Sequence, residues 1–87
     1  MIVYKIFHIP TGKYVMSMMD RYNLSRNSSY ANVTLGKKGK NWNTKSGVII
    51  AAEVLQLNCN QSKVPFKYEE FEIHELTLQI TDRITLK

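Results

Sequence analysis

Residues 2–18 read IVYKIFHIPTGKYVMSM, and this stretch decides the fold of the chain. Its first part, residues 2–9, is rich in β-branched and aromatic side chains, which favour a strand. Pro10 then fixes one backbone angle and Gly12 permits a positive φ, so a tight turn is expected. Residues 14–18 run back as a second strand. The sequence therefore predicts an N-terminal β-hairpin.

A single helix is expected after the hairpin. Thr44 or Asn43 can cap its first turn, because both side chains accept hydrogen bonds from free backbone N–H groups. The expected helix covers residues 45–57, and its apolar positions form two rows, at 48, 51, 52 and 55 and at 50, 54 and 57. So wide an apolar surface predicts a well-buried helix. Before it, residues 32–35 predict a short third strand and residues 19–30 a polar loop.

Strand character returns in residues 66–86. The alternation phase of the apolar residues changes at His74–Glu75, which predicts a bulge or a break there. Two arrangements fit this pattern: one bulged strand near 68–80, or two strands with a turn near Thr81–Asp82. The chain is thus expected to form one α+β domain over residues 1–87. A small antiparallel sheet, made of the N-terminal hairpin plus the C-terminal strand or strands, would pack on one helix.

The composition favours a small binding module. A chain of 87 residues buries only about 60–65% of the surface that it exposes when unfolded. That leaves little room for the cleft that most enzymes need, so no enzyme is expected. Cys59 is the only cysteine, so no internal disulfide can form, and a small buried apolar role is expected for it. His8 and His74 have no paired ligands, so neither a metal site nor a cofactor is expected.

No segment of the sequence has the pattern of a signal peptide or of a membrane span. We therefore expect the protein in the cytoplasm, with no membrane partner. Positive charge is concentrated in residues 1–52, which contain eight lysines and arginines against one aspartate, a net charge of +7. Residues 53–87 contain four against six acidic residues, a net charge of −2. Such asymmetry is typical of a face that meets an anionic partner.

The densest basic stretch is GKKGKNWNTKSG, residues 36–47, which leads into the expected helix. Lysines attract phosphates, a helix N-terminus can bind them, and an aromatic face can stack on a base. The sequence therefore predicts contact with RNA or single-stranded DNA through six residues: Lys37, Lys38, Lys40, Lys45, Arg26 and Tyr30. The alternative is that the lysines only keep a turn soluble. Trp42 is expected mainly in the core.

Other chemistry is less well supported by the sequence. A phosphate-binding P-loop is excluded, because Gly39-Lys40 is followed by Asn41 rather than by serine or threonine. An acidic patch occurs late in the chain, at Glu69, Glu70, Glu72 and Glu75. Its simplest interpretation is the solvated face of a half-buried strand, where charges also discourage edge-to-edge pairing. His8 and His74 have no serine or cysteine nucleophile beside them, and neither is expected to be catalytic.

Two segments, IPTGKYV at residues 9–15 and LGKKGKNWNTKSG at residues 35–47, resemble short uncharacterised accessory proteins of large tailed bacteriophages. Those proteins often carry a Thr-Gly turn near the start, and a lysine- and glycine-rich segment with an aromatic residue before a helix. The resemblance covers residues 5–57, departs in the Asn- and Ser-rich loop, and leaves out the final strands. It implies an accessory role, exerted by binding host nucleases, polymerases or defence systems. It assigns no site residues.

Two functions follow as expectations. In the first, the protein is a non-enzymatic phage-type accessory protein, for host takeover or against host defence. It would bind RNA or single-stranded DNA through the basic turn and the helix N-terminus. In the alternative, it is a protein–protein inhibitor that docks on a host or defence enzyme such as a nuclease or toxin. It would then use an edge strand or the Met-rich end of the hairpin, at Met16, Met18 and Met19. A homodimer is compatible with either function, because small domains gain stability by association.

Overall fold

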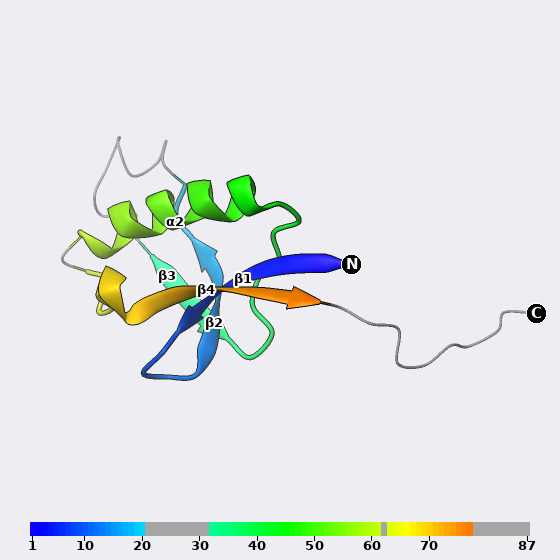
Figure 1. Cartoon of the computed structure of the whole chain (residues 1–87). Helices are drawn as coiled ribbons and strands as arrows, with labels where there is room; N and C mark the ends of the chain where they lie inside the picture. Colours follow the sequence, from blue (N-terminus) through cyan, green and yellow to red (C-terminus); the bar gives the residue numbers. More distant parts are fainter. Residues whose placement is uncertain (21–31, 62, 78–87) are drawn as a thin grey trace, which may run out of the picture.

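Four strands form one antiparallel sheet in the order β3-β2-β1-β4, and one helix, α2, lies across one face of it (Figure 1). The computed structural model describes residues 1–20, 32–61 and 63–77. The elements are β1 (Ile2–His8), β2 (Lys13–Met18), β3 (Val33–Gly36), α2 (Lys45–Cys59), the short 3₁₀ helix η2 (Tyr68–Glu70) and β4 (Phe71–Thr77). The expected α+β class is confirmed, as are the N-terminal hairpin, the single helix beside the sheet and the C-terminal strand.

The hairpin closes through a tight turn. Gly12 has a φ of 70°, and its N–H donates to the carbonyl of His8 at 2.9 Å. β1 and β2 pair at Phe7–Tyr14 and at His8–Lys13, next to the turn. Beyond these pairs the two strands diverge, which leaves a gap in the sheet that a later segment fills.

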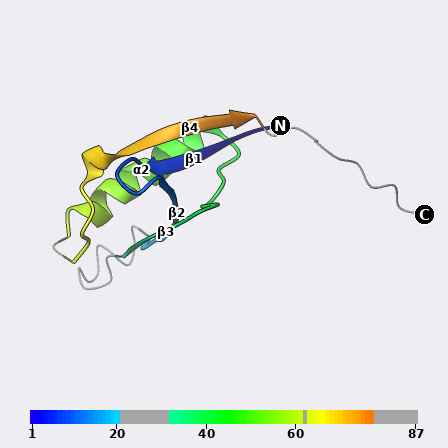
Figure 2. The same cartoon turned by 90° about the horizontal axis from the view of Figure 1, so that it is seen from below.

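β4 pairs with β1 over its whole length without a shift in register, and the two strands run side by side in Figure 2. The bulge or break expected at His74–Glu75 is therefore wrong. The irregularity of the sheet lies elsewhere, between Val15 and Ser17 where β2 pairs with β3. The turn expected near Thr81–Asp82 lies outside the described residues.

The change of apolar phase in β4 has a simple physical reason. Both faces of the sheet hold apolar pairs, so a strand can change phase without breaking. Ile6 lies opposite Ile73 on the side of the helix, where Ile6 belongs to the main core. Val3 lies opposite Leu76 on the other side, and Val3 is only 2% exposed.

The first turn of α2 is capped by Thr44, and not by Asn43. The hydroxyl oxygen of Thr44 accepts a hydrogen bond from the N–H of Gly47 at 3.0 Å. One row of the helix is buried, namely Val48, Ala51, Leu55 and Asn58. The expectation of a well-buried helix is wrong for two residues of the second row, because Ile50 is 57% exposed and Leu57 is 39% exposed, whereas Val54 is half-buried against the core. The helix rests on a single sheet, so the apolar positions farthest from that sheet stay exposed.

Asn58 joins the end of α2 to the ends of β2 and β3. Its side chain is fully buried, and its Oδ1 accepts from the N–H groups of Met19 and Asn32, both at 3.2 Å. Its Nδ2 donates to the carbonyls of Met19 and Val54, both at 2.9 Å. Every polar atom of this buried amide is therefore satisfied. Among the described residues, neither α2 nor η2 has the combined length and apolar character that crossing a membrane requires.

Candidate nucleic-acid interface

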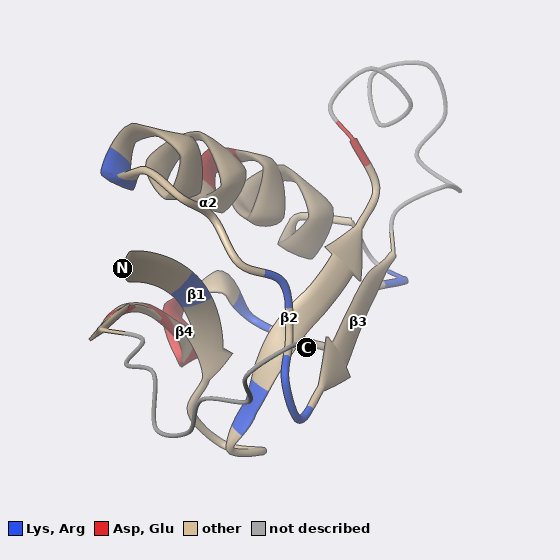
Figure 3. Cartoon of the chain, turned by 90° about the vertical axis from the view of Figure 1, so that its right-hand side faces the viewer, with Lys and Arg blue, Asp and Glu red and all other residues tan. Residues whose placement is uncertain are grey.

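The segment between β3 and α2 carries three of the predicted lysines, and its residues 37–41 form what we call the basic loop. The segment passes in front of β2 in Figure 3 and enters the gap between β1 and β2. The N–H of Lys40 donates to the carbonyl of Val15 at 2.9 Å. Trp42 exchanges backbone hydrogen bonds of 2.8 and 2.9 Å with Tyr4. The backbone is thus tied into the sheet on both sides. The exposed side chains of the loop include those of Lys37, Lys38 and Lys40.

Gly39 allows the basic loop to lie flat against β2. It has a φ of 68°, in the left-handed region that residues with a Cβ rarely adopt. A Cβ at this position would also overlap the Cβ of Tyr14. Both the conformation and the close contact therefore require glycine.

Three half-buried rings meet on the outer face of the sheet, the face opposite α2, and form the aromatic cluster of Phe7, Tyr14 and His74. Phe7 and His74 stack with their centroids 4.5 Å apart, and Tyr14 meets Phe7 edge-on at 5.1 Å. The hydroxyl of Tyr14 lies 3.1 Å from Nδ1 of His74, and Nε2 of His74 lies 2.8 Å from the carboxylate of Glu72. Sequence reasoning missed this cluster, because its rings come from three strands and only the strand register brings them together.

Lys5 joins the aromatic cluster to the basic loop. Its Nζ donates to the backbone carbonyl of Lys38. The same Nζ lies 5.0 Å from the centroid of the Tyr14 ring, a distance at which a cation is attracted to an aromatic face. The basic loop and the aromatic cluster are therefore neighbours on the outer face.

A hollow of about 340 Å³ lies between β2, the basic loop and α2. Met16, Lys40, Trp42 and Ile50 are among the residues that line it. The Nζ of Lys40 lies 5.5 Å from the Trp42 ring. Trp42 is half-buried and packs against the core, in line with the role expected for it. Its packing leaves less of its ring for a base than a fully exposed tryptophan would offer.

Lys45 lies apart from the other three predicted lysines. It begins α2 and lines a different hollow, whose wall includes Ile49 and Glu75. The helix N-terminus beside it is partly occupied, because the hydroxyl oxygen of Thr44 already accepts a hydrogen bond from the N–H of Gly47. A phosphate at this terminus would therefore compete with the cap. Two predicted residues lie outside the described part of the chain and stay predictions: Arg26 and Tyr30.

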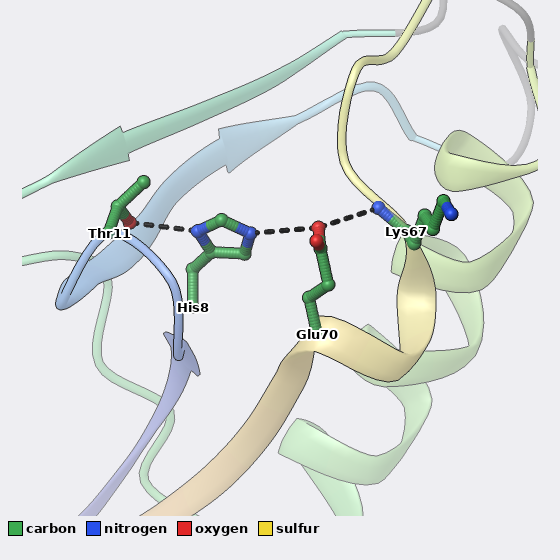
Figure 4. A network of polar contacts seen from close by, with 4 residues as sticks. All are labelled: His8, Thr11, Lys67 and Glu70. Atoms are coloured by element: carbon green, nitrogen blue, oxygen red, sulfur yellow. Dashed lines mark hydrogen bonds and ion pairs between the residues drawn. The ribbon is translucent and has the colours of Figure 1, made fainter.

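A polar network around the buried His8 fixes the hairpin turn to η2 (Figure 4). His8 is only 2% exposed; its Nδ1 lies 2.8 Å from the hydroxyl of Thr11, and its Nε2 lies 3.1 Å from Oε1 of Glu70. The same oxygen accepts from the backbone N–H of Lys67 at 3.0 Å. These bonds lower the pKa of Glu70, with the N–H of Lys67 as the main cause and His8 as the second. Glu70 therefore holds two segments together, and the expected solvated acidic face does not include it.

A hydroxyl, an imidazole and a carboxylate in a row are also the parts of a hydrolase triad. Neither Thr11 nor His8 lines either of the two hollows described above. The N–H of Gly12, the residue after Thr11, is already bound to the carbonyl of His8. We therefore interpret the row as a structural link between the turn and η2.

Cys59 is half-buried at the end of α2. Burial, reinforced by the charges of Glu69 and Glu70, raises the pKa of its thiol to about 11. The thiol is therefore protonated at neutral pH and is a weak nucleophile. Within the described ranges, no group of three or more His, Cys, Asp or Glu side chains is placed to hold a metal ion.

The chain matches no protein-family model. No curated protein and no solved structure is significantly similar to it. Its function is therefore inferred from the geometry of its own surfaces.

Proposed function

We propose that the protein is a non-enzymatic, phage-type accessory protein that binds RNA or single-stranded DNA across the outer face of its sheet. The observation that carries the proposal is the contact among Lys5, Lys38 and Tyr14, which sets the basic loop beside the aromatic cluster. Lysines alone would be compatible with a soluble turn, and buried rings alone with ordinary packing. Together they offer the two interactions that unpaired nucleotides make, with phosphates and with base faces.

The lysines of the basic loop are the proposed phosphate ligands. Lys37 and Lys38 are exposed at the end of β3, and the loop itself contains no acidic residue. Each phosphate that a lysine neutralises releases counterions from the nucleic acid, so affinity depends steeply on salt. The carbonyl of Lys38 is bound by Lys5, which adds a further positive charge at the same place.

The aromatic cluster is the proposed platform for bases. Its rings are half-buried among the strands, so they present a fixed and mostly apolar surface. The bases of a single strand can turn flat onto such a surface, whereas a duplex keeps its base faces stacked inside the helix. Every base has a π face, so little sequence preference is expected.

The accessory role rests on the resemblance of residues 5–57 and on the small size of the chain. The proposed location is the cytoplasm of the infected host cell, where RNA and single-stranded DNA are both accessible. A host protein is the second proposed partner, and a basic protein can bind RNA while it blocks an enzyme.

Fluorescence anisotropy with three labelled ligands tests the proposal: an RNA strand, a DNA strand and a DNA duplex of the same sequence. We expect dissociation constants of about a micromolar or weaker for the strands at low salt, and weaker binding of the duplex. Equal affinity for the single strands and the duplex would mean that the lysines supply the affinity and that the aromatic cluster does not contribute to it. No binding of any ligand at low salt would contradict the proposal and leave the lysines as a solubilising feature.

A further inference from the structure

Among the described residues, β4 is the outermost strand on its side of the sheet. The backbone groups of a strand point alternately to its two sides. The N–H of Ile9 donates to the carbonyl of Glu70 at 2.9 Å, which fixes this alternation along the pairing of β1 with β4. The N–H and C=O groups of Phe71, Ile73 and Glu75 therefore point away from β1. No described strand pairs with this side of β4, which we call the free edge, so it can accept a further strand.

An apolar groove runs beside this edge, between β4 and α2. It consists of two hollows of about 360 and 330 Å³, and Ile73 lines both of them. Ile73 is 42% exposed, and Ile49 of α2, on the wall of the second hollow, is 45% exposed. A strand added to β4 would direct alternate side chains towards α2. An apolar side chain of that strand would cover both isoleucines.

The charge of the groove indicates the chemistry of its occupant. Three carboxylates line it: Glu69, Glu72 and Glu75. Glu72 lies 2.8 Å from His74, and Glu75 accepts a hydrogen bond from the hydroxyl of Tyr4 at 3.0 Å. In the part of the chain that the structure describes, none of the three forms an ion pair with lysine or arginine. Among the described residues that line the two hollows, Lys45 at one end is the single cation.

We propose that the free edge of β4 binds an extended basic segment of a partner protein by strand addition. Backbone hydrogen bonds would supply affinity, and the groove would select an apolar side chain over Ile73. Its alternate lysine or arginine side chains would lie on the outer face of the sheet, beside Glu72. A second copy fits less well, because pairing of β4 with itself brings like charges together. The basic loop crosses β2, on the other side of β1, so its lysines can be changed without altering this edge (Figure 3).

The probe for this site is a short peptide of alternating lysine and valine, titrated into isotope-labelled full-length protein at low salt. We expect the amide signals of Phe71, Ile73 and Glu75 to shift, and those of the basic loop to stay unchanged. A peptide with glutamate in place of lysine tests the charge requirement. A peptide with proline in place of a central valine keeps the charge but loses a strand hydrogen bond. Neither control peptide is expected to bind.

Two variants of the protein complete the test. The double variant Glu72→Lys, Glu75→Lys reverses the charge of the edge. It should lower the affinity for the lysine peptide by about tenfold or more. Ile73→Pro removes an N–H that points away from β1, so the sheet should persist while peptide binding is lost. Circular dichroism checks that the proline variant is folded; if it is not, the charge-reversal variant decides.

The proposal would be overturned if the glutamate peptide bound as tightly as the lysine peptide, or if no peptide shifted the amide signals of Phe71, Ile73 and Glu75. It would also be overturned if the charge-reversal variant bound the lysine peptide as tightly as the wild type does. A wild-type dimer that Ile73→Pro dissociates would assign the edge to a second copy, and would also overturn it. The variant Lys37→Gln, Lys38→Gln should bind the peptide as the wild type does. A failure of oligonucleotide binding is therefore distinguishable from a failure of this site.

Discussion

Tyr4 and Trp42 exchange two backbone hydrogen bonds, of 2.8 and 2.9 Å, at the point where β1 and β2 diverge. This pair makes the residue after the basic loop a part of the sheet, and the bond from Lys40 to Val15 holds the loop itself. A free lysine-rich turn would lose conformational entropy when it binds a ligand. A loop that the sheet already holds loses less, so its lysines are presented from an ordered backbone.

Gly39→Ala should strongly destabilise the protein. The new Cβ would overlap Tyr14, and the positive φ of 68° would be strained, so the free energy of unfolding should fall by about 2 kcal/mol or more. Gly12→Ala is the matched control. Its φ is 70°, but a Cβ there meets no atom within 4 Å, so only the conformational cost of about 1–2 kcal/mol applies. Urea unfolding measures the loss of unfolding free energy in both variants. Equal losses would contradict the close packing of the basic loop on β2.

Asn58→Asp tests the buried amide. The carboxylate keeps the two accepted hydrogen bonds but has no donor for the carbonyls of Met19 and Val54. Each lost partner costs about 1–3 kcal/mol and the buried charge costs more, so a loss of at least about 3 kcal/mol is expected at neutral pH. Asn60→Asp, at an exposed position just beyond the helix, is the control and should change stability little. A small effect at Asn58 would argue against the described hydrogen bonds.

Stability should depend on pH through Glu70. Its pKa in the folded protein lies below the ordinary value of 4.5, because the N–H of Lys67 and the ring of His8 stabilise the carboxylate. A lowered pKa contributes stability that is present above the ordinary pKa and is lost as the pH falls through the lowered value. Glu70→Gln should therefore flatten the acid limb of a plot of unfolding free energy against pH. Glu69→Gln, at an exposed neighbour, serves as the control, and an unchanged acid limb in Glu70→Gln would refute the link.

Phe7→Leu tests the role of the rings in binding. Leucine fills much of the same space but offers no aromatic face, so binding of a single strand should weaken by about 1–3 kcal/mol if a base stacks there. Phe66→Leu is the control, because Phe66 is also half-buried but packs against His8 and Phe71 instead. Anisotropy titrations of the folded variants compare the two. Similar affinities for both variants would place the bases elsewhere.

Local pattern accounts for most of what the sequence predicted correctly. Pro10 and Gly12 mark the turn, Thr44 caps the helix, and the alternating residues on either side form strands that pair as expected. The errors come from tertiary context. The phase change in β4 indicated a break because a strand with apolar residues on both faces has no regular alternation of apolar and polar residues in its sequence. Ile50 and Leu57 of the second apolar row of α2 are exposed because one sheet covers only one side of a helix.

The candidate surface was predicted in part. The lysines of the basic loop are evident in the sequence, but their neighbours are not. Tyr14 and His74 are far apart in the chain, and their contact depends on the order and register of three strands. His8 and Glu70 are also far apart in the chain, and they meet because the pairing of β1 with β4 brings η2 beside the end of β1. Pairing Phe7 with Tyr14 across the hairpin was the one signal that could have indicated the aromatic cluster.

Salt titration of two matched double variants tests the central claim most directly. Lys37→Gln, Lys38→Gln and Lys63→Gln, Lys67→Gln have the same net charge, but only the first changes the basic loop. We predict that the loop variant binds a labelled RNA strand more weakly, and that its plot of log affinity against log salt is shallower by about 1.4, or about 0.7 for each lost phosphate contact. The Lys63, Lys67 variant should behave like the wild type. Equal weakening of both variants would show that net charge alone attracts the nucleic acid, and would contradict a site at the basic loop.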